Sequence, residues 1–395
     1  MLCVSLFITL EKEQLVNSLC LLTTLKGVDM GATEHEIKHS DAASQVKEKT
    51  KEERIHDAVV ATAPGTSLRR ALDMIIAGNM GALICVGDTD AVLAAGNDGF
   101  PLNISFTANR LFELSKMDGA IVIDKGMTQI YRANFCLDPD PSLPTSETGM
   151  RHRTAARMSL LTKAMVISVS ERRHVVSVFV DGHRFQLRSV PEIMSSVNQL
   201  LVTLQNSRQT LDRSLLRLTT LELDNYVTLG DISEVFYQFE VLMTSAEQLQ
   251  KCIDELGSEG KTVDMQRDEF VGDMDEEYDL MIRDYATDSS EEHAKEIRVK
   301  FHAMNNKDLR STKRIAELLG YHDKTEDSIM TPLGLRTLSR VSVVREGMAE
   351  KIVDEYGSLQ ELLDDIQDNP SRLDSLGVKN PSLLAASLYR MWGKH

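Results

Sequence analysis

The chain has 395 residues, 42% of them apolar and 26% charged, which is ordinary for a folded protein of two or three domains. Its formal net charge of −16 argues against a protein that coats nucleic acid, because such proteins carry a basic surface. The five cysteines are odd in number and widely spaced, so the sequence predicts neither a disulfide framework nor a zinc site. This use of cysteine indicates a reducing, cytoplasmic location.

The N-terminus begins with the apolar run MLCVSLFITL, which is too short for a membrane-spanning helix of about 20 residues. No basic segment precedes it, which argues against a signal peptide. We expect the natural start at Met30, followed by a disordered, polar lead-in over residues 31–54. Residues 1–54 are therefore assigned to an N-terminal extension, and no membrane partner is expected.

Residues 55–190 mix helical and strand patterns. A Thr-Ser cap and a closing glycine predict a helix over 66–78, and two more helices are expected over 107–116 and 151–163. Short apolar runs bounded by turn residues predict strands at 82–87, 91–96, 119–124, 164–170 and 175–182. The combination predicts an α/β domain with a mixed central sheet.

After Pro191 the pattern becomes entirely helical. Apolar residues recur at steps of three and four along one seam, at Val197, Leu201, Leu204, Leu211, Leu215 and Leu218. This spacing, interrupted by Arg208, predicts a long helix with a narrow apolar contact. Further helices are expected at about 230–256, 264–285, 290–303 and 307–319. Residues 191–325 are therefore predicted to form an all-α helical spine with acidic, solvated outer faces.

Residues 326–395 are divided by glycine and proline at close intervals. Helices this short do not stand alone, so the segment predicts a small, compact all-α domain.

The segment TSETGMRHRTAARMS, residues 145–159, places Arg151-His152-Arg153 behind turn-forming residues. The triplet is expected at the N-terminus of a helix, where free N–H groups and the helix dipole favour an anion. Two guanidiniums and an imidazole there suit a polyphosphate. A triplet of this kind is also common in solvated surface turns.

A second motif is MDGAIVID, residues 117–124, in which Asp118-Gly119 precedes an expected strand. An exposed carboxylate beside a phosphate site is a candidate ligand for Mg²⁺ or Mn²⁺, or a group that orients an attacking hydroxyl. Taken alone, Asp-Gly is most often simply a turn.

Asp118-Gly119-Ala120, followed 33 residues later by Arg151-His152-Arg153, resembles the paired signature of the diadenylate cyclase family. The flanks over 132–157 and 166–182 resemble the same family. The order of domains over about residues 55–395 resembles the members of this family that add a helical spine and a C-terminal helix-hairpin-helix domain. The resemblance implies that two ATP molecules condense into cyclic di-3′,5′-AMP with release of two pyrophosphates. No Walker A loop is present.

The resemblance also implies residue roles. Asp118 would hold the metal or polarise the 3′-hydroxyl, and it acts with Arg151, His152 and Arg153 as the catalytic set. The expected ATP-binding residues are Gly119 against the nucleotide, Leu137 at the adenine, Arg151, His152, Arg153 and Thr154 at the phosphates, and Ser170 on the next strand. Met150 belongs to the same segment but stands where the family usually has threonine. A backbone contact to ATP would survive this change, whereas a hydroxyl contact would be lost.

The C-terminal stretch LDSLGVKNPSLLAASLYRMW, residues 373–392, resembles the second hairpin of a helix-hairpin-helix domain. Such hairpins bind the DNA backbone through the N–H groups of glycines. Here Lys379 replaces the second glycine. The candidate DNA-binding residues are Arg340, Arg345, Gly377 and Lys379. The segment carries 8 basic against 11 acidic residues, so we expect weak binding that favours branched DNA and depends on several domains acting together.

The favoured hypothesis is thus a diadenylate cyclase coupled to DNA. The alternative is a DNA-backbone scaffold whose nucleotide site is a weakly active sensor. A purely structural helical protein is disfavoured, because it would need neither polar motif. Cyclisation needs two ATP molecules in antiparallel poses, so two cyclase domains must meet, and the resemblance implies a homo-octamer. It also implies a bacterial protein, with association with the nucleoid as an open alternative.

Overall fold

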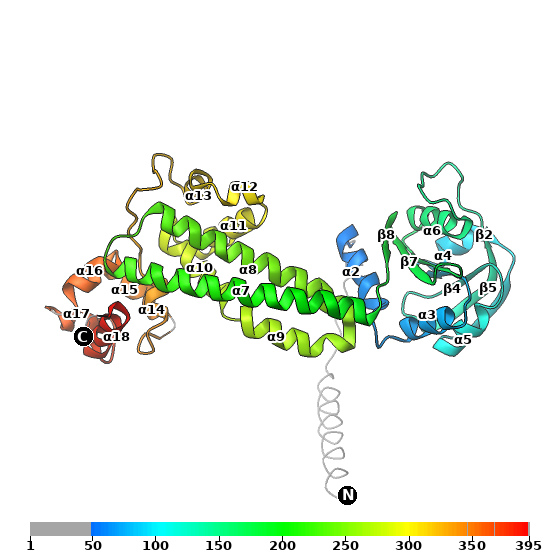
Figure 1. The fold of residues 1–395 in the computed structure, drawn as a ribbon, viewed down its shortest axis with the longest axis horizontal. Coiled ribbons are helices and arrows are strands. Elements are labelled where there is room, and N and C mark those ends of the chain that lie inside the picture. The colour runs from blue at the N-terminus through cyan, green and yellow to red at the C-terminus, as the bar shows by residue number, and fades with distance from the viewer. Residues whose placement is uncertain (1–48, 346, 367, 394–395) are drawn as a thin grey trace, which may run out of the picture. The chain divides into compact units, whose positions relative to one another are not determined.

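The computed structural model describes residues 49–345, 347–366 and 368–393 (Figure 1). The expectations for residues 1–48 lie outside the described residues. A disordered lead-in is wrong for residues 51–54, which open helix α2 (Lys51–Ala61). The side chain of Thr50 accepts the N–H of Glu53, and the Glu53 carboxylate accepts the N–H of Thr50. This capping box stabilises the helix start that the polar composition concealed.

A mixed sheet lies at the centre of the first domain, as the sequence predicted, and it has eight strands. Strand β1 lies at its centre, parallel to β4 on one side and antiparallel to β6 on the other. The strand order is β2-β5-β4-β1-β6-β7-β8, and β3 pairs with β5. The strands are β1 (Ala82–Val86), β2 (Gly96–Asn97), β3 (Phe100–Ser105), β4 (Ala120–Ile123), β5 (Gln129–Leu137), β6 (Met165–Ser170), β7 (Val175–Val180) and β8 (His183–Gln186).

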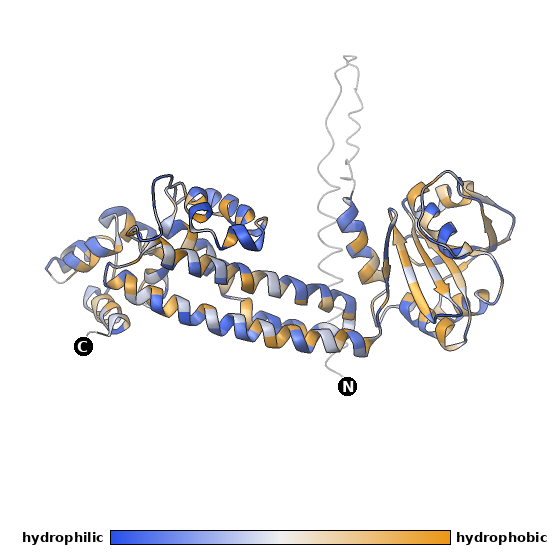
Figure 2. Ribbon diagram, turned by 45° about the horizontal axis from the view of Figure 1, so that its top comes forward, coloured by the Kyte–Doolittle hydropathy of each residue, from blue (hydrophilic) through white to orange (hydrophobic). Residues whose placement is uncertain are grey.

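Helices cover both faces of this sheet. One core cluster joins alternate residues of the strands to α3 (Ser67–Ala77) and α5 (Ala108–Leu114), together with Ala58 of α2. The other joins the remaining strand residues to α4 (Thr89–Ala94) and α6 (Met150–Leu161). Figure 2 shows the strands coloured mainly as hydrophobic, as expected when both faces are buried.

The predicted helices at 66–78, 107–116 and 151–163 are confirmed as α3, α5 and α6. The strand predicted at 91–96 is wrong, because this alanine-rich run forms helix α4 and only its last residue enters β2. The other four predicted strands are confirmed as β1, β4, β6 and β7, whereas β3, β5 and β8 were not predicted.

The helical region follows, and its seam is confirmed. Helix α7 (Val190–Leu223) buries every seam residue except Leu201, which is half-buried, against α8 (Leu229–Leu256). The polar interruption, Arg208, pairs with Asp212 and Asp273. The predicted helix over 264–285 breaks at Gly272, and that over 307–319 breaks at residues 310–311. The remaining elements are η1 (Gly257–Gly260), α9 (Lys261–Val271), α10 (Met274–Tyr285), α11 (Glu291–His302), α12 (Asn306–Leu309) and α13 (Thr312–Leu318).

The C-terminal helices have a core of their own, to which Leu223 of α7 also contributes. Buried charges join them to the spine: Arg336 pairs with Glu222 of α7 at 2.6 Å, and both are shielded from solvent. The Asp284 carboxylate of α10 accepts the N–H groups that open α14. The regular elements in the described part of this segment are helices, while a helix-hairpin-helix fold stays a prediction, as do the domain boundaries. The helices are α14 (Leu335–Ser339), α15 (Met348–Tyr356), α16 (Leu359–Asp365), α17 (Pro370–Ser375) and α18 (Pro381–Trp392).

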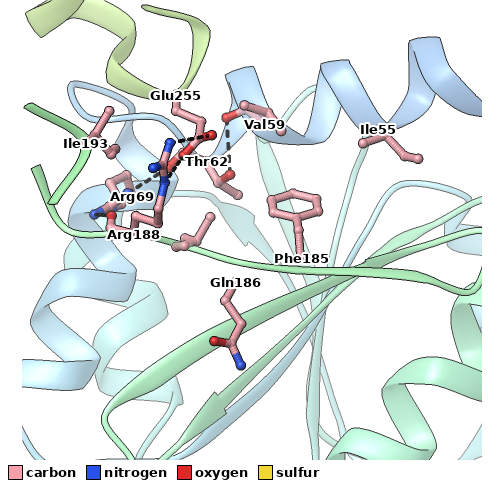
Figure 3. A pocket seen from close by; sticks show the side chains of 10 residues that line it. Ile55, Val59, Thr62, Arg69, Phe185, Gln186, Arg188, Ile193 and Glu255 are labelled. Atoms are coloured by element: carbon pink, nitrogen blue, oxygen red, sulfur yellow. Dashed lines mark hydrogen bonds and ion pairs between the residues drawn. The ribbon is translucent and has the colours of Figure 1, made fainter. Parts of the chain in front are cut away.

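A cavity of about 160 Å³ lies where β8 leads into α7 (Figure 3). Arg188 donates two hydrogen bonds of 2.9 Å to the Glu255 carboxylate of α8 beside it. Arg69 of α3 donates to the carbonyl of Arg188. These contacts hold the sheet domain and the segment before α7 against the end of α8. Within the described residues, no helix is both long and apolar enough to cross a membrane.

Candidate functional site

The residues predicted at the site converge where β1 and β4 begin and β5 and β6 end. This edge of the sheet is formed by strand ends and not by an edge strand. Leu83 of β1 pairs with Ala120 of β4, and Ala82 pairs with Val169 of β6. The starts of β1 and β4 therefore lie beside the end of β6, which is Ser170. On the far side of β4, Ala120 pairs with Phe135, which brings the end of β5 to the same edge. Asp118, Gly119, Leu137 and Ser170, distant in sequence, thus share one border.

Asp118 sits at this edge with its side chain 98% exposed. Its carboxylate lies 3.8 Å from the guanidinium of Arg151. The amide of Asn134 donates a 2.7 Å hydrogen bond to the Asp118 carbonyl, which fixes the backbone that presents the carboxylate. The described residues nearby leave this carboxylate open to solvent and to a ligand.

Gly119 has a positive φ of 84°, and a Cβ there would lie 2.7 Å from the backbone of Asn134. Glycine is therefore required by the turn and by the close approach of β5, whatever it contacts in a nucleotide. Asn134, itself at φ 51°, occupies an irregularity in the pairing of β4 with β5. No local pattern in the sequence predicts this role of Asn134, because the bulge appears only in the strand register.

Helix α6 begins at this edge with the Arg-His-Arg triplet in its first turn, as predicted. Its N-cap is Gly149, and among the described residues no side chain caps it. The first amides of the helix are thus available to an anion beside two exposed arginines, Arg151 and Arg153. Met150 is 77% exposed, so its side chain contributes little to the core.

Space for Arg151 comes from Gly81, the residue before β1. A Cβ on Gly81 would lie 2.3 Å from Nη1 of Arg151. The guanidinium therefore rests against bare backbone, between Gly81 and the Asp118 carboxylate. The sequence did not single out Gly81, and nothing in its local pattern links it to a residue 70 positions away.

His152 points back toward the sheet. Its Nδ1 is 3.4 Å from Oγ of Ser168, and its ring meets Phe179 edge to face at 6.1 Å. Burial, and next the positive charge of Arg184, lower the pKa of the imidazole, which is only partly offset by Glu147. His152 is thus a neutral imidazole near pH 7, a weaker phosphate ligand by charge than the two arginines beside it.

Three predicted residues lie at the margin of this site. Leu137 ends β5 and is half-buried against the core beneath α6. Thr154 lies farther along α6 and is half-buried. The Ser170 hydroxyl accepts the N–H of Arg173 at 3.4 Å in the turn after β6. That turn adds Arg172 and Arg173, both exposed, which were not predicted as site residues.

The comparisons with known proteins address the same segments. Residues 69–184 match the family model described as DisA bacterial checkpoint controller nucleotide-binding. Residues 187–328 match the model of the DisA bacterial checkpoint controller linker region. Together the two models span more than half of the chain. The chain belongs to the DisA family.

Curated relatives agree with this assignment. The DNA integrity scanning protein DisA of Carboxydothermus hydrogenoformans is 35% identical over 79% of this chain and 90% of its own length. The proteins of the same name from Symbiobacterium thermophilum and Kineococcus radiotolerans are 36% and 35% identical, over 83% and 87% of this chain and 93% and 97% of their own lengths. The resemblance first read from two short motifs is confirmed, and it narrows to the DisA family.

For a DisA-family chain the metal donors at this edge are few. Among the described residues, no group of three or more His, Cys, Asp or Glu side chains has the geometry of a metal site. Asp118 offers the exposed carboxylate nearest Arg151, and Asp138 and Glu171, which directly follow Leu137 and Ser170, are exposed as well. This fits Mg²⁺ or Mn²⁺ held by one carboxylate and by substrate phosphates better than a cage made of protein alone.

The four candidate DNA-binding residues of this DisA-family chain differ in their exposure and in their contacts within the protein. Arg340 pairs with Glu277 of α10 at 2.5 Å, so its charge is largely neutralised. Gly377 has φ 90° and open space around it, but its N–H donates to the Asp374 carbonyl at 3.1 Å. Arg345 and Lys379 are exposed. Arg345 and Lys379 are therefore the stronger candidates for phosphate contact.

Proposed function

We propose that the chain condenses two ATP molecules into cyclic di-3′,5′-AMP and releases two pyrophosphates. The observation that carries this proposal is the placement of Asp118 3.8 Å from Arg151 at the open sheet edge. This edge lies within the segment that matches the nucleotide-binding model of the DisA family.

In the proposed reaction, the 3′-oxygen of each ATP attacks the α-phosphorus of the other. A P–O bond forms, the bond to the bridging oxygen of the pyrophosphate breaks, and the hydroxyl proton passes to solvent. Such a reaction depends mainly on positioning and on neutralising phosphate charge. Arg151, Arg153 and the first amides of α6 would neutralise the triphosphate, His152 and Thr154 would hydrogen-bond to it, and Ser170 would bind it from β6. Leu137 would pack on the adenine, with Gly119 beside the sugar.

Asp118 would orient the 3′-hydroxyl, either directly or as the protein ligand of Mg²⁺ or Mn²⁺. When bound, the divalent cation would supply charge stabilisation to the phosphate oxygens.

One site of this form holds one ATP, so we propose a homo-oligomer in which two sheet edges meet, with an octamer as the expected assembly. Such a contact is compatible with the exposed apolar residues of the first domain, which include Met150 and Phe100. Light scattering under assay conditions tests this. A strictly monomeric, fully active species would overturn it.

We also propose that the C-terminal helices bind the DNA backbone, since the relatives of this chain are named DNA integrity scanning proteins. Exposed Lys379 and Arg345 supply the cations, while the net negative charge of the segment keeps single-domain affinity low. Branched DNA, which presents phosphates to several domains of an oligomer, is the expected partner. Lys379→Glu should weaken binding to junction and duplex DNA alike and reduce the salt slope by about one unit. Affinities unchanged across a salt series would remove Lys379 from the interface.

The direct experiment for catalysis is incubation of the full chain with ATP and Mg²⁺ or Mn²⁺, followed by mass-spectrometric detection of the cyclic dinucleotide. The second candidate is a DNA scaffold with a weakly active, nucleotide-sensing site. The observation that favours it is Met150, which cannot supply the hydroxyl that threonine offers. Saturable ATP binding without product, restored to turnover by Met150→Thr, would support this second function.

A further inference from the structure

An ion pair holds the segment that leads into α6 against strand β8. Glu147, two residues before the N-cap Gly149, accepts a 2.9 Å hydrogen bond from Nη1 of Arg184 on the edge strand β8. The two side chains are only 17% and 31% exposed. Shielding of this degree makes the pair stronger than an ordinary surface salt bridge.

Arg184 and His152 share the same aromatic ring. Arg184 is the cross-strand neighbour of Phe179, and its guanidinium carbon lies 6.0 Å from the ring centroid. His152 meets that ring at 6.1 Å with an interplanar angle of 80°. Phe179 itself is buried. The ring thus couples the side chain of β8 to the imidazole of α6.

The rest of the loop has a separate anchor. Arg157, in the middle of α6, donates to the carbonyls of Leu143 and Pro141 at 3.0 and 2.7 Å. That contact holds the first part of the loop, whereas Glu147 holds the part that sets where the helix begins. Loss of the Glu147–Arg184 contact therefore frees the helix start without freeing the whole loop.

We propose that Glu147 and Arg184 are positioning residues for the cyclase reaction, holding the helix start and the His152 ring where the triphosphate must meet them. This inference rests on the proposed function. Cations that are already in position need no reorganisation when the phosphates bind. Such preorganisation is the main source of catalysis in phosphoryl transfer.

The pKa of His152 provides a measurement that would not change if Glu147 and Arg184 only stabilised the fold. Arg184 of β8, Arg173 of the β6–β7 turn and Arg151 of α6 lower the pKa of the imidazole after burial, whereas Glu147 of the loop raises it. Loss of Arg184 should therefore raise the His152 pKa, and loss of Glu147 should lower it. The two partners of one ion pair act in opposite directions on the same group.

The test compares Arg184→Met, Glu147→Gln and the double variant in the full chain. Each single variant should lower kcat about tenfold with a smaller change in KM, because the helix start moves by a fraction of an ångström. The double variant should be no worse than either single one, because both remove the same contact. The control is Arg54→Met, which breaks the Arg54–Asp181 pair of similar exposure (24% and 21%) on the same domain.

The second measurement is the affinity for a non-hydrolysable ATP analogue between pH 5 and 8, with His152→Gln to identify the contribution of the imidazole. The pH midpoint should rise in Arg184→Met and fall in Glu147→Gln. Single variants that match Arg54→Met, effects that add in the double variant, or midpoints that move together would overturn the positioning role. If the unaltered chain makes no product, the proposed function fails, whereas the analogue midpoints still decide whether Glu147 and Arg184 act on His152.

Discussion

Gly81 has no side chain at the point where the guanidinium of Arg151 crosses the start of β1. In Gly81→Ala, the new Cβ would lie 2.3 Å from Nη1 and 3.0 Å from Cζ of Arg151. Because non-bonded heavy atoms pack best at about 3.5 Å, the guanidinium must retreat by about 1 Å. The clash involves the flexible end of a side chain, so the arginine moves and the fold does not.

The expected loss follows from this displacement. A 1 Å misplacement of a catalytic group costs about 100-fold in rate, or about 2.7 kcal/mol of transition-state stabilisation. The free energy of unfolding should instead rise, because Gly81 is not among the glycines with positive φ. Replacing glycine by alanine in an unstrained conformation typically adds about 0.4–1 kcal/mol to the free energy of unfolding.

The assay is steady-state formation of the cyclic dinucleotide, with thermal unfolding measured on the same preparations. Gly126→Ala, in the turn at the other end of β4, is the matched control, because its φ is also not positive and its Cβ meets a side-chain oxygen at 3.2 Å. Equal rates in the two folded variants would refute the reasoning that Gly81 makes room for Arg151.

The remaining predictions concern the buried charges that join the C-terminal helices to the spine. Arg336→Met leaves Glu222 buried without its cation, so the free energy of unfolding should fall by about 3–5 kcal/mol in denaturant titration; a loss below about 1 kcal/mol would contradict a structural role for the pair. Burial, and next the charge of Glu222, raise the pKa of Asp284 to about 7. The native state then keeps a proton that the unfolded chain releases near its ordinary pKa of 3.8, so stability should decline as pH rises from about 4 to 7. Asp284→Asn should flatten this part of the stability–pH curve, and an unchanged slope would show that another group titrates there.

Much of the fold was readable from local patterns. The seam from Val197 to Leu218 predicted the long helix, because its six apolar residues recur with the helical period. The Thr66 cap and Gly78 likewise bracket α3. The run at 91–96 misled because its three alanines and its leucine suit a helix as well as a strand, and its only buried residue within α4 is Val92. Strand β5 was missed because its irregular pairing at Asn134 breaks the alternation of apolar residues.

The site was predictable as a pair of motifs but not as an arrangement. The spacing of Asp118 and Arg151 indicated a family, whereas their meeting at one sheet edge depends on the order of β4, β1 and β6. The supporting contacts of Gly81 with Arg151, and of Glu147 with Arg184, join residues 70 and 37 positions apart. Such contacts follow from tertiary packing, which a single sequence does not encode in any local pattern.

The central claim is that the sheet edge around Asp118 cyclises ATP. The most direct test is to incubate the full chain and its Asp118→Asn variant with ATP and Mg²⁺ or Mn²⁺, and to quantify the cyclic dinucleotide and pyrophosphate. We predict one cyclic dinucleotide for every two pyrophosphates from the unaltered chain, and none from the variant, which should keep its unfolding temperature because the side chain is 98% exposed. The absence of product from the folded, unaltered chain with either metal, or equal rates from the variant, would contradict the claim.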